Sequence, residues 1–172
     1  STRPRLLAGA GQRDRSMSEV KIRTRPPAAY EADFQAWTRE QAARLRDLRP
    51  NSIDWENVAE EIESLGKSER REIRSRLVVL LAHLLKWAYQ PDARSNSWRA
   101  SILEARTEIR GELDESPSLR RYPGEVLAQQ YEVARLSAAG DSGLGVDTFP
   151  ATCPFTIEEV LDPEFWPEGV QS

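Results

Sequence analysis

Two short stretches of the chain hold the residues best suited to chemistry. Residues 59–66 read AEEIESLG, with three glutamates in four positions, and residues 83–87 read HLLKW, with the single histidine close to a lysine. Carboxylates and imidazoles are the groups that acid–base catalysis and metal binding use most often. The first question is whether these side chains meet in one site or only line two packed helices.

Among the glutamates, Glu61 has the best position for contact with another helix. At about 100° per residue, Glu61 lies at the edge of the apolar stripe around Ile62, while Glu60 and Glu63 point mostly to solvent. Metal-binding helical bundles combine inward carboxylates with Glu-x-x-His pairs, and this sequence has no such pair. We therefore assign no metal ligand and no cofactor. A carboxylate-only magnesium or manganese site is the alternative.

His83 and Cys153 each have a structural and a catalytic interpretation. For His83, we expect a half-buried ring that donates to a carbonyl or to a carboxylate such as Glu61. Its ordinary pKa of about 6.5 also suits a general base. We expect Cys153, in the segment TCPFT, to be a small buried side chain. The alternative is a cysteine nucleophile with His83 as its base.

Charge is distributed unevenly along the chain. Residues 1–27 carry seven basic and two acidic residues, and residues 67–110 carry ten basic and five acidic ones. Residues 141–172 carry seven acidic residues and no basic one. The basic middle and the acidic end can attract each other within one fold. The overall pI of about 5.2 argues against a nucleic-acid partner.

The basic stretch also contains aromatic residues. Arg94, Arg99 and Arg106 surround Trp98, and Lys86 precedes Trp87. Such residues bind phosphates and stack on bases, but their stems also cover apolar stripes of helical bundles. No phosphate-binding glycine loop, Gly-x-Ser-x-Gly elbow or His-Glu-x-x-His motif accompanies them. The candidate catalytic residues are therefore Glu61, His83, Lys86, Arg99 and Cys153, with no role established for any of them.

The elements that position these residues are predicted to be helices. Apolar residues recur at three- and four-residue spacing from Tyr30 onward, and strand signals are almost absent. Asp54 is a predicted N-cap, Gly66 a predicted helix end, and Pro91 ends the most apolar segment. We expect an all-α fold: a bundle of about five helices with a C-terminal arm docked on it, including a short helix near 156–162.

The domain organisation follows from composition. Residues 1–27 are expected to be an extension and flexible lead-in, of which residues 1–16 precede the only methionine, Met17. Residues 28–172 are expected to form a single helical domain that includes the arm, 141–172. One cysteine excludes an internal disulfide, and the longest apolar stretch is too short to span a membrane. We expect a cytoplasmic protein without a membrane partner.

Several blocks of the sequence together resemble a bacterial family, domain-of-unknown-function family 29. They are YEADFQAWTREQAARLR, WENVAEEIESLGKSERREIRSRLVVLLAHLLKWAYQP, RSNSWRASILEAR, SPSLRRY and TFPATCPFTIEEVLDPEFWP. The resemblance runs from about residue 30 to residue 167. It implies a compact helical fold and no established activity, cofactor or catalytic residue.

The function expected from these observations is binding rather than catalysis. Nucleophile, metal and phosphate motifs are missing, whereas aromatic-rich amphipathic helices are plentiful. The leading hypothesis is therefore a protein that binds a protein partner or associates with itself. The second hypothesis is a hydrolase or nuclease that uses Glu61 and His83 with Lys86 and Arg99. The third is nucleic-acid binding through residues 67–110.

Overall fold

The computed structural model describes residues 28–48 and 53–170, and all regular secondary structure in this part of the chain is helical. The helices are α1 (Ala28–Ala32), α2 (Phe34–Leu48), α3 (Trp55–Tyr89), α4 (Asn96–Glu115), α5 (Tyr122–Ser142) and α6 (Ile157–Leu161). Short 3-10 turns lie at Pro91–Ala93, Pro117–Leu119 and Val146–Thr148. The prediction of an all-α bundle is confirmed. The expected extension, 1–27, lies outside the described residues.

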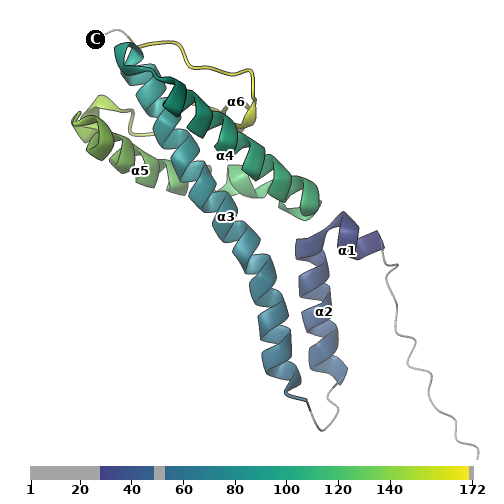
Figure 1. The fold of residues 1–172 in the computed structure, drawn as a ribbon. Coiled ribbons are helices and arrows are strands. Elements are labelled where there is room, and N and C mark those ends of the chain that lie inside the picture. Colours follow the sequence, from purple (N-terminus) through teal and green to yellow (C-terminus); the bar gives the residue numbers. More distant parts are fainter. Residues whose placement is uncertain (1–27, 49–52, 171–172) are drawn as a thin grey trace, which may run out of the picture.

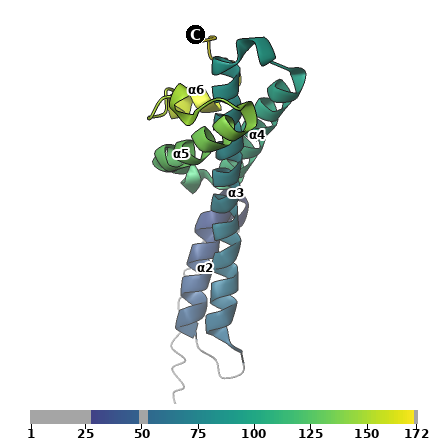
Figure 2. The same ribbon diagram turned by 90° about the vertical axis from the view of Figure 1, so that its left-hand side faces the viewer.

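Helix α3 is the axis of the molecule. Its 35 residues span about 52 Å at 1.5 Å per residue. The C-terminal half of α3 packs against α4, α5 and α6, while its N-terminal half packs against α2 (Figure 1). Figure 2 shows the consequence: α2 and the first half of α3 form an antiparallel hairpin that projects from the helical body.

The prediction that a helix ends at Gly66 is wrong, because α3 continues through it. Gly66 is buried against α2. A Cβ atom at this position would lie 2.6 Å from Thr38 Oγ1 and 3.4 Å from Gln35 Cγ. The glycine is therefore explained by the close approach of α2 and α3 rather than by a helix terminus.

The hydrophobic core lies around the C-terminal half of α3. Helix α3 contributes leucines that are fully buried, and α4 and α5 contribute isoleucine, tyrosine and alanine side chains. The main fully buried members are Leu77, Leu80, Leu81, Leu84, Leu85, Ile102, Ile109, Tyr131 and Ala134. The near-continuous apolar run of residues 77–89 is thus explained by helices on several sides of α3.

Side-chain caps set several of the helix starts. Asp33 Oδ1 accepts a hydrogen bond from the Ala36 amide at 2.8 Å, at the start of α2. Asp54 accepts from the Asn57 amide at 3.2 Å, which confirms the predicted N-cap of α3. Thr156 and Glu159 form a reciprocal capping box that begins α6. The short helix expected near 156–162 is therefore confirmed.

The C-terminal arm is docked on the body, as predicted. Phe149 and Val160 of the arm are buried in the core. Arg106 of α4 donates from Nε to the Val160 carbonyl at 2.8 Å and from an Nη to the Phe165 carbonyl at 2.9 Å. Tyr131 donates its hydroxyl to the Pro150 carbonyl at 2.6 Å. Buried side chains of α4 and α5 thus hold the backbone of the arm in place.

Candidate functional site

The structure does not bring Glu61 and His83 together. Both residues lie on α3, and His83 follows Glu61 by 22 residues, which is about 33 Å along the helix. His83 Nδ1 lies 2.8 Å from the Val79 carbonyl oxygen, one helical turn earlier. Of the two expected partners for His83, the carbonyl is therefore present and Glu61 is not. A site that uses both side chains on one substrate is not formed within one chain.

Lys86 and Arg99 take part in packing between helices. Lys86 is buried, its Nζ lies 3.1 Å from an oxygen of Asp141, and it lies over the Trp98 ring at 5.2 Å from the ring centroid. Arg99 lies over the Trp166 ring at 5.3 Å. Each cation thus joins elements that are distant in sequence.

Cys153 is a free cysteine that is partly rather than fully buried. Its Sγ lies 3.3 Å from the Phe155 carbonyl oxygen, and burial raises the pKa of the thiol. Burial also lowers the pKa of His83, which favours the neutral ring at pH 7. A cysteine thiol with a raised pKa has little thiolate, which is the reactive form.

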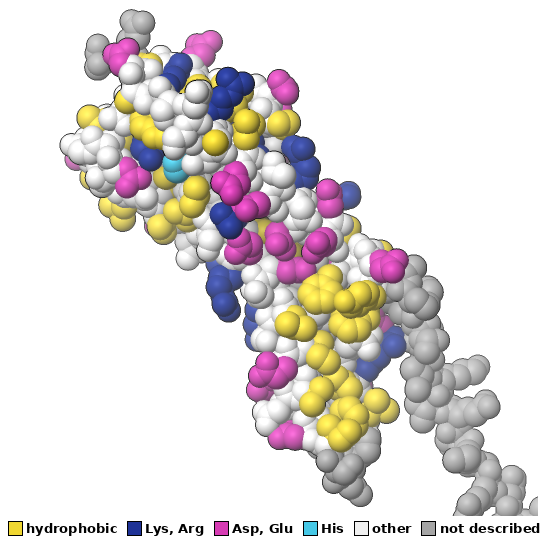
Figure 3. All heavy atoms as spheres, in the orientation of Figure 1, with side chains coloured by type: hydrophobic (Ala, Val, Ile, Leu, Met, Phe, Trp, Pro, Cys, Tyr) yellow, Lys and Arg dark blue, Asp and Glu magenta, His cyan; other side chains and the backbone are white. Residues whose placement is uncertain are grey.

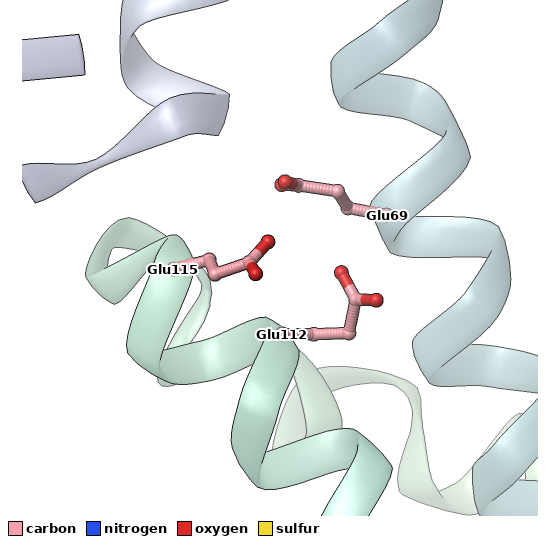
Figure 4. Close-up of side chains that lie close together, drawn as sticks. All are labelled: Glu69, Glu112 and Glu115. Carbon is pink, nitrogen blue, oxygen red and sulfur yellow. The ribbon is translucent and has the colours of Figure 1, made fainter. Parts of the chain in front are cut away.

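Three carboxylates that were not predicted do meet. Glu69 of α3 and Glu112 and Glu115 of α4 each offer an oxygen atom, and these oxygens lie within 4.8 Å of one another. Figure 4 shows the three side chains pointing toward a common space between the two helices. Oxygen donors of this kind suit hard cations such as Mg²⁺ or Mn²⁺. Among residues 28–48 and 53–170, these glutamates, which we call the acidic cluster, form the group that could hold a metal ion.

The acidic cluster lies at the junction between the hairpin and the body. The Ser116 hydroxyl donates a hydrogen bond to a Glu69 carboxylate oxygen at 2.6 Å and accepts one from the backbone amide of Gln35 at 3.1 Å. Asp33 accepts from the hydroxyl of Ser118 at 2.9 Å. The end of α4, the start of α2 and the middle of α3 are therefore tied together here.

Burial and mutual repulsion raise two pKa values in the acidic cluster. The pKa of Glu69 is raised chiefly by burial, and the nearby charges of Glu115 and Asp33 add to this, while the Ser116 hydrogen bond opposes it. The pKa of Glu112 is raised by burial and then by the charges of Glu69 and Glu115. At neutral pH, the ionised carboxylates of Glu69 and Glu112 therefore lower the free energy of unfolding.

Removal of one charge from the acidic cluster is expected to stabilise the protein. Glu112→Gln should raise the free energy of unfolding at pH 7 by about 0.5 kcal/mol or more, because it removes the cost of burying this charge and relieves like-charge repulsion. The pKa of Glu112 is higher in the folded chain than its ordinary value of 4.5, so the ionised carboxylate lowers the free energy of unfolding at neutral pH. This loss of stability disappears as the pH falls to about 4.5, because the carboxyl is then protonated in the folded chain. The gain measured by urea unfolding should therefore shrink below about pH 4.5.

Glu132→Gln on the exposed side of α5 is the control for this prediction, because it removes the same charge outside the acidic cluster. It should change stability little at either pH. Equal effects of the two variants at pH 7, or a gain in Glu112→Gln that persists at pH 4, would contradict the interpretation.

The hairpin carries a second feature, an apolar face that no described element covers. Where α2 and α3 pack, the buried residues are small apart from the polar Gln35: they are Thr38 and Ala42 of α2 and Ala59 and Gly66 of α3. The large apolar side chains lie to the side instead. They are the exposed Tyr30, Leu48, Ile53, Val58 and Leu65 and the half-buried Phe34, Trp37, Leu45 and Ile62. We call this set the hairpin face.

Figure 3 shows the hairpin face as a hydrophobic surface that runs along the hairpin, with acidic side chains gathered beside its upper end. At the upper end, Tyr30, Phe34 and Trp37 pack ring against ring, with centroids 4.8–6.1 Å apart. At the lower end a shallow groove of about 560 Å³ runs along α3, lined by Asp54, Asn57, Val58, Glu61, Ile62 and Leu65. Glu61 is thus part of the rim of an apolar surface.

Comparison with known families gives a clear assignment. The family model described as "Domain of unknown function DUF29" matches residues 29–166. The chain belongs to the DUF29 family. The family resemblance seen in the sequence is therefore confirmed, and membership adds no activity to what the geometry shows.

A solved structure with the same fold is known. This DUF29 chain is similar to an α-helical protein of unknown function from Rhodospirillum rubrum ATCC 11170, with 26% sequence identity and a TM-score of 0.62. The similarity covers 79% of this chain and 90% of that one. No curated protein matches the chain. Among the described residues of this DUF29 domain, no helix combines the length and apolar character needed to cross a membrane.

The basic stretch of this DUF29 domain, residues 67–110, is largely engaged in internal contacts. Arg94 lies over the Trp87 ring at 5.0 Å, and Arg106 lies over Trp166 at 5.6 Å. Arg76 pairs with Glu72 at 2.7 Å and with Glu108 at 2.5 Å. The interleaving of basic and aromatic residues thus serves packing in this structure.

Proposed function

We propose that this protein acts by self-association, with the hairpin faces of two copies packed together. One observation carries the proposal: the hairpin buries small side chains between its own helices and turns its large apolar ones outward. Two helices alone enclose no core, whereas two stacked hairpins form a four-helix bundle. A two-fold pair would use the same face on both copies.

The charges of α2 and α3 support a second copy of the chain as the partner that covers the hairpin face. Residues 34–48 carry three basic and two acidic residues, whereas residues 53–67 carry one basic and five acidic ones. In a two-fold stack with both hairpin tips at the same end, α2 of each copy lies on α3 of the other. The weakly basic helix then meets the acidic one on both sides of the interface.

The first test compares two exposed leucines. Leu65 lies on the hairpin face and is 50% exposed, and Leu136 lies on α5 and is 65% exposed. Leu65→Glu should abolish the dimer in sedimentation velocity, because it places a charge in an apolar interface. Leu136→Glu should leave the dimer intact. A dimer that survives Leu65→Glu, or that both variants abolish equally, would contradict the proposal.

The second test fixes the orientation by cross-linking in a Cys153→Ser background. Arg46 bonds to Glu56 at 2.9 Å and to Glu63 at 2.8 Å, so residues 45 and 58 lie at similar heights on the hairpin. In the proposed stack, residue 45 of one copy lies near residue 58 of the other. A mixture of Leu45→Cys and Val58→Cys should therefore form an oxidised dimer more readily than either variant alone. Absence of this preference would contradict the stack.

A further inference from the structure

A pocket lies where the C-terminal arm passes the end of α3. It has a volume of about 450 Å³, within the range of small-ligand sites. Its walls include four aromatic side chains and two carboxylates: Tyr89, Phe155, Phe165, Trp166, Glu159 and Glu168. The Val170 amide donates to the Ala88 carbonyl at 2.7 Å and so ties the arm to the end of α3 beside the pocket. This pocket is separate from the hairpin face and from the acidic cluster.

Three features of the pocket wall favour a positively charged ligand. Aromatic rings present negative faces, the two glutamates carry full charges, and the C-terminal end of a helix carries a partial negative charge. Tyr89 is the last residue of α3, so the pocket adjoins that helix end. The capping box fixes Glu159, whose carboxylate accepts a hydrogen bond from the Thr156 amide at 2.9 Å.

Three arginines lie beside the pocket and disfavour a cation there: Arg99 and Arg106 lie over the Trp166 ring, and an Nη of Arg94 lies 3.5 Å from the Pro167 carbonyl oxygen. Arg106 donates to the carbonyls of Val160 and Phe165, and Arg94 donates to the Trp87 carbonyl at 2.9 Å. Arg99 is exposed, and solvent screens its charge. None of these three arginines lines the pocket, whereas Glu159 and Glu168 do.

We propose that this pocket binds a small organic cation with a quaternary ammonium group. A metal ion or a primary ammonium is strongly hydrated and needs several hydrogen-bond acceptors to replace its water. A quaternary ammonium donates no hydrogen bond, and its diffuse charge is stabilised by aromatic faces and by carboxylates in its neighbourhood.

The test uses choline chloride and its neutral isostere, 3,3-dimethyl-1-butanol, which has the same shape without the charge. Each is titrated into the full chain while ¹H–¹⁵N correlation spectra are recorded, with sodium chloride added to match the ionic strength. Choline should give saturable shifts of the Trp166 indole and of the amides around the pocket. The isostere should bind at least about tenfold more weakly. Shifts of equal affinity for both compounds, or no saturable shift with choline, would overturn the proposal.

Three variants locate the site. Glu168→Gln removes an exposed carboxylate of the pocket wall, and the matched Glu164→Gln removes one from the same arm that does not line the pocket. Choline binding should weaken severalfold in Glu168→Gln and stay unchanged in Glu164→Gln. Phe165→Leu keeps an apolar side chain but removes the ring face, and it should also weaken binding. Equal binding by the wild type and Glu168→Gln would place choline elsewhere and overturn the assignment.

Discussion

Replacement of Arg106 by alanine is expected to lower the free energy of unfolding by about 3 kcal/mol. Arg106 is 2% exposed and donates to two carbonyls of the arm, at 2.8 and 2.9 Å. A hydrogen bond from a charged group contributes about 1.5–3 kcal/mol, and its loss leaves a buried carbonyl without a partner. Relief of the buried charge, whose pKa is lowered by burial, offsets part of this loss. Urea unfolding monitored by tryptophan fluorescence measures the change.

Arg99 provides the matched control for Arg106. Both arginines lie over the Trp166 ring, at 5.3 and 5.6 Å, but Arg99 is exposed and makes no hydrogen bond to the arm among the described contacts. Arg99→Ala should therefore cost less than about 1 kcal/mol. If the two variants lost similar stability, stacking on Trp166 rather than the carbonyl contacts would hold the arm.

Alanine at Gly66 should destabilise the protein, although alanine is the better helix former. The helix propensity favours alanine by about 1 kcal/mol. The new Cβ would meet Thr38 Oγ1 at 2.6 Å, and Thr38 is fully buried and bonded to the Gln35 carbonyl at 2.9 Å. Overpacking of this kind costs about 1–3 kcal/mol, and the propensity gain offsets part of it, so the net loss should be up to about 2 kcal/mol.

Gly111→Ala is the control, because Gly111 lies in α4 with no atom within 4 Å of a Cβ at that position. This variant should gain up to about 1 kcal/mol. Thr38→Ala should rescue Gly66→Ala, so that the double variant is more stable than the sum of the single changes by about 1–2 kcal/mol. A stabilising Gly66→Ala, measured by the same unfolding experiment, would show that α2 and α3 are not held at this distance.

Most of the helices could be predicted from the sequence because their signals are local. Asp54 as an N-cap, the stop at Pro91 and the short helix beginning at Thr156 depend on neighbouring residues only. Gly66 was misread because a glycine that ends a helix and a glycine that admits a second helix have the same local sequence. Only the contact with Thr38, which is distant in sequence, shows that Gly66 admits a second helix rather than ending one.

The same error affected the candidate site. With a break at Gly66, Glu61 and His83 belong to two helices that could fold against each other. With one continuous helix they are held about 33 Å apart. The acidic cluster was missed because Glu69, Glu112 and Glu115 look like ordinary exposed helix residues. The three-residue spacing of Glu112 and Glu115 is a signal, but the contribution of Glu69 depends on the packing of α3 against α4.

The apolar stripes of α2 and α3 could be predicted from the sequence. Whether these stripes face each other or point away from the hairpin could not. A stripe predicts that a helix will bury that face. In this structure the small residues Ala42, Ala59 and Gly66 take the contact between the two helices. The larger residues are left on the hairpin face, which is the feature that the proposed self-association uses.

The mass of the wild-type protein in solution is the most direct test of self-association. Sedimentation equilibrium of the full chain over a wide range of concentrations should give a species of twice the 19.5 kDa chain mass, dissociating as the protein is diluted. A mass of 19.5 kDa at every concentration would mean that two copies do not cover the hairpin face.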